Sequence, residues 1–149
     1  MAIMGLSCRN NQLFDEIRKI WVEATPEEVV RQRLLYQLVH HLKFPKEYIA
    51  IEKELKTLPH LAEVEVPNRR CDVICFSRGT LSPLLLIECK QHVLTDQARA
   101  QLLGYNHFVK APFVALVNAQ ETLFGYETGE WRYLSFIPTY EALLRVVIK

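Results

Sequence analysis

Two charged side chains at the end of an apolar run have types and a spacing that could support hydrolytic chemistry. Residues 83–90 read PLLLIECK, so that Glu88 and Lys90 stand two residues apart. Because successive side chains of a strand point to opposite faces, Glu88 and Lys90 would share a face. Burying a carboxylate and an ammonium there is unfavourable unless they are paired or bind a metal. The strand end is therefore a candidate catalytic site.

A second carboxylate, Asp72, lies within another apolar run, CDVICF, at residues 71–76. A hairpin between the two runs would bring Asp72 and Glu88 to one edge of a sheet. Two such carboxylates repel unless a cation joins them, and Mg²⁺ is commonly held by one or two carboxylates, waters and phosphate oxygens. A bound cation lowers the pKa of water and neutralises charge on a phosphodiester. Lys90 could then orient the water or stabilise the transition state.

The spacing by itself leaves a simpler interpretation open. Glu88 and Lys90 could form an ordinary ion pair at a partly exposed strand end. Asp72 could likewise be bonded to Arg69 or Arg70, which lie three and two residues before it. A structural protein with such a fortuitous ion pair is one alternative to an enzyme.

Helices and strands must position these residues. Thr25 can cap a helix that begins at Pro26, residues 48–55 alternate as in a half-buried strand, and the apolar run 113–117 is typical of a strand buried on both faces. The expected elements are helices over 11–22, 25–42, 95–110 and 139–148, and strands over 48–55, 71–76, 83–90, 113–117, 122–127 and 131–136. The first three strands are expected to form an antiparallel meander, and the whole an α/β domain with helices packed on a mixed sheet.

Composition favours one globular domain over residues 1–149. Half of the residues are hydrophobic and 23% are charged, while a net charge of +1 excludes a global basic field. No apolar stretch has the length of a membrane span, and residues 1–6 lack the features of a secretory leader, so a cytoplasmic location is expected. The four cysteines form no C-x-x-C pair, which indicates buried thiols and not a zinc site.

Three short motifs in order give the chain a resemblance to a known family. They are RCDV at 70–73, LLLIECK at 84–90 and QLLGYN at 101–106. The chain resembles the PD-(D/E)XK nuclease superfamily and, more narrowly, the nuclease domain at the N-terminus of the R (motor) subunit of type I restriction enzymes. Further similarity lies at 25–32, 45–53, 117–118 and 137–141, so the resemblance covers about residues 25–141. It implies a restriction-endonuclease-like core with the order α-β-β-β-α-β and additions at both ends.

The resemblance also implies roles for individual residues. Asp72 and Glu88 would be ligands of Mg²⁺ or Mn²⁺, the backbone carbonyl of Cys89 would complete the metal shell, and Lys90 would be the catalytic lysine. Gln101 and Tyr105 match a Q-x-x-x-Y motif whose members share a helix face and would support the metal site and contact the DNA backbone. Two alternatives remain, because Tyr105 could be a core aromatic and Gln101 a solvated helix residue.

In this superfamily an acidic residue from the first helix or first strand often joins the site. The candidates are Glu27, Glu28, Glu52 and Glu54. The family pattern favours Glu28 and Glu52, although a capping box explains the first and a solvated strand face the second. DNA contacts are expected from basic residues near the site, which are Arg69, Arg70, Arg78, Lys90, His92 and Arg99. Without a base-reading motif, little sequence specificity is expected.

The sequence therefore predicts a Mg²⁺- or Mn²⁺-dependent deoxyribonuclease, endonuclease or exonuclease. The alternative is a catalytically silent or partner-dependent DNA-binding module of a restriction or repair system. No G-x-x-x-x-G-K-[ST] phosphate loop is present, so a motor or a specificity function would come from a protein partner. One departure from the superfamily pattern is that Arg70-Cys71, and not a proline, precedes Asp72.

Overall fold

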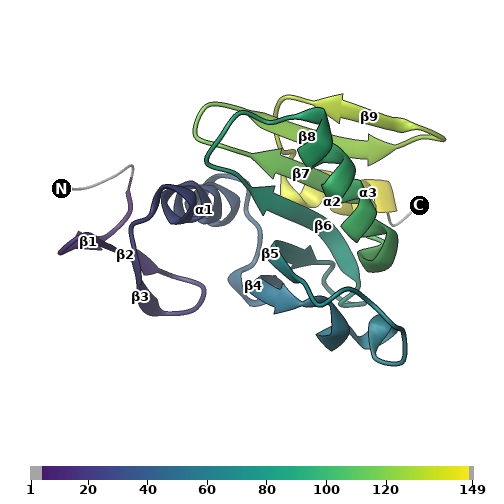
Figure 1. Cartoon of the computed structure of the whole chain (residues 1–149), viewed down its shortest axis with the longest axis horizontal. Coiled ribbons are helices and arrows are strands. Elements are labelled where there is room, and N and C mark those ends of the chain that lie inside the picture. The colour runs from purple at the N-terminus through teal and green to yellow at the C-terminus, as the bar shows by residue number, and fades with distance from the viewer. Residues whose placement is uncertain (1–4, 148–149) are drawn as a thin grey trace.

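A six-stranded mixed sheet organises the computed structural model, which describes residues 5–147 (Figure 1). Its strands follow one another in chain order and are β4 (Ile49–Glu54), β5 (Arg70–Phe76), β6 (Pro83–Cys89), β7 (Phe113–Val117), β8 (Thr122–Glu127) and β9 (Trp131–Leu134). Neighbours are antiparallel except β6 and β7, which are parallel and joined through helix α2 (Asp96–Val109). The predicted meander, the element order and the α/β class are confirmed.

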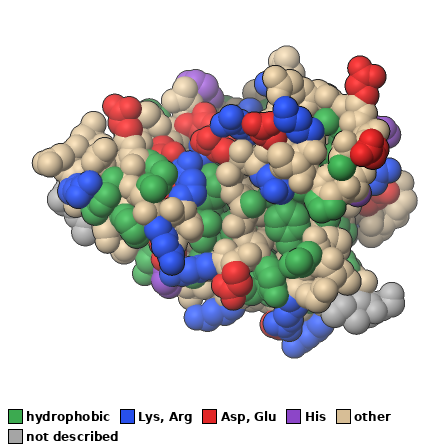
Figure 2. All heavy atoms as spheres, turned by 90° about the horizontal axis from the view of Figure 1, so that it is seen from below, with side chains coloured by type: hydrophobic (Ala, Val, Ile, Leu, Met, Phe, Trp, Pro, Cys, Tyr) green, Lys and Arg blue, Asp and Glu red, His purple; other side chains and the backbone are tan. Residues whose placement is uncertain are grey.

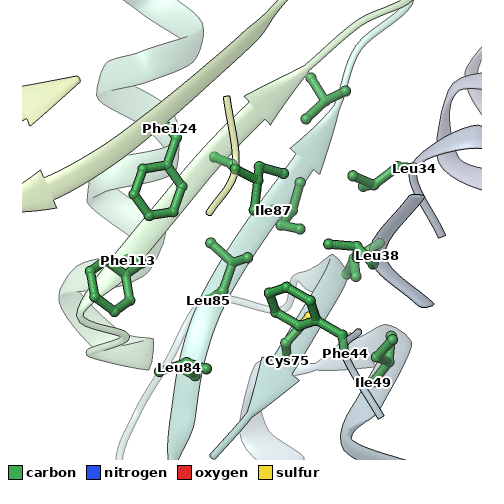
Figure 3. Packing of buried hydrophobic residues seen from close by; sticks show 14 of the residues in the cluster. Leu34, Leu38, Phe44, Ile49, Cys75, Leu84, Leu85, Ile87, Phe113 and Phe124 are labelled. Atoms are coloured by element: carbon green, nitrogen blue, oxygen red, sulfur yellow. The ribbon is translucent and has the colours of Figure 1, made fainter. Parts of the chain in front are cut away.

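Helices α1 (Pro26–Tyr36) and α2 cover opposite faces of this sheet. The Thr25 side chain accepts a hydrogen bond from the Glu28 N–H, and Pro26 occupies the first turn, as predicted. The segment Gln37–His41 continues α1 as a π-helix. Its i→i+5 hydrogen bond is donated by the Leu42 N–H to the Gln37 carbonyl. Figure 3 shows Leu34 and Leu38 directed toward Leu85 and Ile87 of β6.

The second core lies beneath α2. There Leu102 is buried with Leu86 of β6 and Leu116 of β7. All five residues of β7 are buried, as its continuous apolar run predicts. Because β6 carries buried residues on both faces, the charged end of that strand is held firmly between two packed layers.

The helix predicted over 11–22 is wrong. The chain forms a small separate sheet there, with strands β1 (Cys8–Arg9), β2 (Gln12–Asp15) and β3 (Ile20–Glu23). The Asp15 carboxylate accepts hydrogen bonds from the backbone N–H groups of Ile17 and Arg18 and thereby stabilises the turn between β2 and β3. Strands of four residues are too short for apolar spacing to separate them from a helix. Figure 1 shows this sheet beside α1, at the end of the molecule away from β9.

The remaining elements are short. They are 3₁₀ turns at Lys46–Tyr48, Leu55–Thr57 and Pro59–Leu61 and the last helix, α3 (Tyr140–Val147). Within residues 5–147 no helix is both long and apolar enough to cross a membrane. Residues 1–4, on which the expectation of no secretory leader partly rests, and Ile148, at the end of the predicted last helix, lie outside the described residues.

Candidate active site

Asp72 and Glu88 come together because β5 and β6 are antiparallel. Their register pairs Val73 with Ile87, so the next position places Asp72 opposite Glu88. The Asp72 Oδ2 atom accepts a hydrogen bond of 2.9 Å from the backbone N–H of Cys89. This bond holds the aspartate carboxylate against the end of β6, as the sequence predicts.

Both carboxylates line a polar pocket of about 680 Å³. The pocket lies between α2 and the segment that joins β4 to β5, and its lining residues are Glu54, Lys56, Asn68, Arg69, Arg70, Asp72, Glu88, Lys90, Ala98, Gln101, Leu102 and Tyr105. Six of the predicted site residues are therefore collected in one cavity. Lys56 and Asn68 also line it. They lie in an irregular polar segment, which has no periodic pattern that would predict this position.

Lys90 and helix α2 form the walls beside the carboxylates. Lys90 follows β6 directly, and its backbone N–H donates to the Val117 carbonyl over 2.8 Å, which continues the ladder to β7. In α2, the buried Leu102 turns Gln101 and Tyr105 toward the pocket. Arg69 lies over the Tyr105 ring, 4.9 Å from its centroid, and donates to the tyrosine hydroxyl. Tyr105 both lines the cavity and packs against the core beneath α2.

The simpler ion pairs are not formed. Among residues 5–147, no pair within 4.0 Å joins Glu88 to Lys90, or Asp72 to Arg69 or Arg70. Arg70 instead lies 3.5 Å from Glu54 and 3.8 Å from Glu52. Asp72 and Glu88 are thus left facing the pocket without a neutralising side chain at contact distance.

Burial and the nearby charge of Asp72 strongly perturb Glu88. The pKa of Glu88 is raised from 4.5 to about 8, first by burial and then by the charge of Asp72 and a hydrogen bond with it, while Lys90 opposes the shift. A proton or a cation would relieve the repulsion. The donor set therefore fits a divalent metal held by two carboxylates.

The protein would supply few further ligands. Over the described range 5–147, no group of three or more His, Cys, Asp or Glu side chains is arranged to hold a metal ion. Mg²⁺ commonly keeps several waters and binds substrate phosphates beside one or two carboxylates, which matches a pair of acids in an open pocket. The role of the Cys89 carbonyl stays a prediction.

Three of the four cysteine thiols are buried. Burial, followed by the charges of Glu88 and Asp72, raises the pKa of Cys71 to about 12. Burial also raises the pKa values of Cys75 and Cys89. All four cysteines are free, and Cys71, Cys75 and Cys89 are buried as predicted, whereas Cys8 is half-buried.

The structure places Glu28 and Glu52 outside the pocket, although Glu54 lines it. The carboxylates of Glu28 and Glu52 lie in a second group of charged and polar side chains, which come from β2 and the turn after it, from α1 and from β4. That group, here called the α1 charge network, consists of Asp15, Arg18, Glu28, Arg31, Gln32 and Glu52. Sequence reasoning did not single out Arg31, whose available signal was its position beside the buried residues Val30 and Leu34 and three residues after Glu28.

The predicted DNA-contacting residues are dispersed. Arg69, Arg70 and Lys90 line the pocket, while Arg78 pairs with Glu141 over 2.6 Å and Arg99 pairs with Asp96 over 3.0 Å. Figure 2 shows basic and acidic side chains side by side along the upper middle of the face seen there, without one broad basic field. The carboxylate pocket itself is lined by four basic side chains, Lys56, Arg69, Arg70 and Lys90, beside its acidic ones.

One comparison with known proteins gave a match. A family model described as type I restriction enzyme R protein N terminus matches residues 26–138. Comparisons with curated proteins and with solved structures gave no significant match. The matched segment contains β4–β9, α1 and α2 and hence the whole pocket, whereas the sheet of β1–β3 precedes it.

Proposed function

Since the chain belongs to the family of type I restriction enzyme R protein N-terminal domains, we propose that it is a Mg²⁺- or Mn²⁺-dependent phosphodiesterase that cleaves DNA. The observation that carries the proposal is the pair of Asp72 and Glu88, side by side in a polar pocket with no cationic side chain within ion-pair distance in the described structure. A divalent cation bound there supplies Lewis-acid activation of water and neutralises phosphate charge.

The residues of the pocket have distinct roles in this proposal. Asp72 and Glu88 hold the cation, and the raised pKa of Glu88 requires its proton to leave when the cation binds. The Lys90 ammonium orients the attacking water or donates to a phosphate oxygen as negative charge develops.

The pocket walls would place the DNA backbone. Gln101 and Tyr105 line one side, and Lys56, Arg69 and Arg70 line the same cavity with positive charge. Phosphate contacts position a duplex or single strand without reading its sequence. Cleavage with little sequence preference is therefore expected, and selection of a target would fall to a partner.

The test uses the full chain with circular single-stranded, circular double-stranded and linear DNA. We expect cleavage with Mg²⁺ or Mn²⁺ and none with EDTA. Asp72→Ala, Glu88→Ala and Lys90→Ala should each reduce the rate by about a hundredfold or more, the usual effect of removing a group that stabilises the transition state. Glu130→Ala is the matched control, because Glu130 is exposed and its carboxylate pairs with Arg132, which is also exposed.

Two outcomes would contradict the proposal in different ways. If the wild-type protein cleaves no form of DNA and calorimetry detects no Mg²⁺ or Mn²⁺ binding, a metal-dependent nuclease is excluded. If gel shifts show DNA binding without turnover under every metal condition, the chain is a silent or partner-dependent DNA-binding module.

A further inference from the structure

Arg31 is a buried cation next to the carboxylate site but outside its pocket. Its side chain is 7% exposed, and its Nη1 donates to Glu52 Oε1 over 2.8 Å. Its Nε is 3.4 Å from Glu28 Oε2 but makes no hydrogen bond. The pKa of Arg31 is raised, since the bond to Glu52 and the charges of Glu28 and Asp72 outweigh burial, which acts in the opposite direction. Arg31 is thus bonded to Glu52 and lies close enough to Asp72 for their charges to interact.

The backbone at Glu52 has an unusual conformation. Its φ is +52° within β4, which is uncommon for a residue other than glycine. Ile51 pairs with Val73, and Lys53 with Cys71, so Glu52 stands opposite Asp72. Since Asp72 stands opposite Glu88, three adjacent strands carry three acidic residues in one row. A left-handed residue in a strand persists only where its surroundings enforce it.

The side chain of Glu52 leaves the face on which strand alternation would place it. Ala50 packs against the core beneath α2, and Glu54 lines the pocket. Glu52, midway between them, should point to the same side. Its carboxylate instead reaches Arg31 of α1 and lies 3.8 Å from Arg18 and from Arg70. With 39% of its side chain exposed, Glu52 is not held there by packing.

We propose that Arg31 is a positioning residue that holds the Glu52 carboxylate on the α1 side of the sheet, so that Asp72 and Glu88 are the two carboxylates that bind the cation in the pocket. The inference rests on the proposed metal site. A third carboxylate would add negative charge and occupy a position needed for water or a phosphate oxygen. Arg31 therefore leaves a coordination position of the cation free for water or a phosphate oxygen. The cation is bound less tightly than it would be with a third carboxylate.

The test is calorimetric titration of the full chain with MnCl₂ alone, without DNA. Arg31→Gln releases Glu52 and should tighten Mn²⁺ binding by about tenfold, since affinity follows the number of charged ligands. Arg31→Gln also removes a positive charge near Asp72, so two double variants separate the causes. One double variant adds Glu52→Gln to Arg31→Gln, and the other adds Glu28→Gln. Each removes an acid that contacts Arg31 and so restores the net charge of the group.

The two double variants should differ. With Glu52 absent, Mn²⁺ affinity should return to the wild-type value, whereas with Glu28 absent and Glu52 retained the increase should persist. Equal affinities in the two double variants, or an Arg31→Gln variant that binds like wild type, would overturn the inference while leaving the metal site intact.

A measurement on the wild-type protein covers the case in which Arg31→Gln does not fold. In crystals soaked with Mn²⁺, anomalous density should lie between Asp72 and Glu88, with Glu52 still bonded to Arg31. Coordination of the ion by Glu52 would overturn the inference alone. Wild-type protein that binds no Mn²⁺ in solution or in crystals would overturn the proposed function and the inference with it.

Discussion

The raised pKa of Glu88 makes the stability of the metal-free protein depend on pH in a definite direction. In the unfolded chain Glu88 titrates near 4.5, and in the folded protein near 8. Between these values the unfolded state has released a proton that the folded state retains. The free energy of unfolding must then fall as pH rises through this window. Replacing Glu88 by Gln removes the titrating group and with it this loss of stability.

The size of the effect follows from the same shift. The two pKa values of Glu88 differ by about 3.5 units, and each unit corresponds to about 1.4 kcal/mol, so the upper limit is about 5 kcal/mol. Because part of the Glu88 shift comes from the neighbouring Asp72 carboxylate, part of the effect belongs to the interacting pair and the measured value should be smaller. Relative to wild type, Glu88→Gln should gain a few kcal/mol of stability between pH 5 and pH 8.

Urea unfolding in EDTA at half-unit steps from pH 5 to pH 9 measures this difference. The two proteins differ only at residue 88, so the wild-type curve minus the variant curve reports Glu88 together with its interaction with Asp72. Glu130→Gln, at an exposed position, controls for the loss of one negative charge. Parallel wild-type and Glu88→Gln curves across pH 5 to 8 would refute the buried, repelled state of Glu88 on which the metal proposal depends.

Two further predictions concern stability alone. Asp15→Asn should lower the free energy of unfolding by about 3 kcal/mol, as expected for breaking a buried ion pair, because the fully buried Asp15 carboxylate accepts bonds from Arg18 and Gln32. Urea unfolding checks this, and Asp96→Asn at an exposed pair should change stability by less than about 1 kcal/mol; equal effects would contradict the account. Gly125→Ala should destabilise by about 1–3 kcal/mol through overpacking, because a Cβ there would lie 2.9 Å from the Val114 side chain. An unchanged melting temperature would show that β7 and β8 are less tightly packed than described.

The carboxylate pocket was predictable because it depends on local pattern and on the pairing of neighbouring strands. Alternation along the runs that contain Asp72 and Glu88 predicts their faces, and a hairpin between neighbouring strands brings them together. Gln101 and Tyr105 reach the pocket by helical spacing alone. Each of these steps uses residues within one element or two consecutive ones.

The N-terminal sheet and the α1 charge network were not predictable in this way. The spacing of Leu13 and Ile17 fits a helix, but the turn at Asp15 is stabilised by Arg18 and by Gln32, which lies in the next element. Similarly, strand alternation places Glu52 beside the pocket, and a left-handed backbone together with Arg31 directs it elsewhere. Contacts between separate elements override local preference at both positions.

The sequence by itself determined the family, the order of the core elements and the pair of acids with a lysine at one strand end. Only the tertiary structure decided which acidic residues enter the pocket. The physical reason for Glu52 is that α1 packs against the sheet and brings Arg31, 21 residues earlier in the chain, within hydrogen-bond distance of its carboxylate. The periodicity of hydrophobic residues in the sequence does not predict that contact.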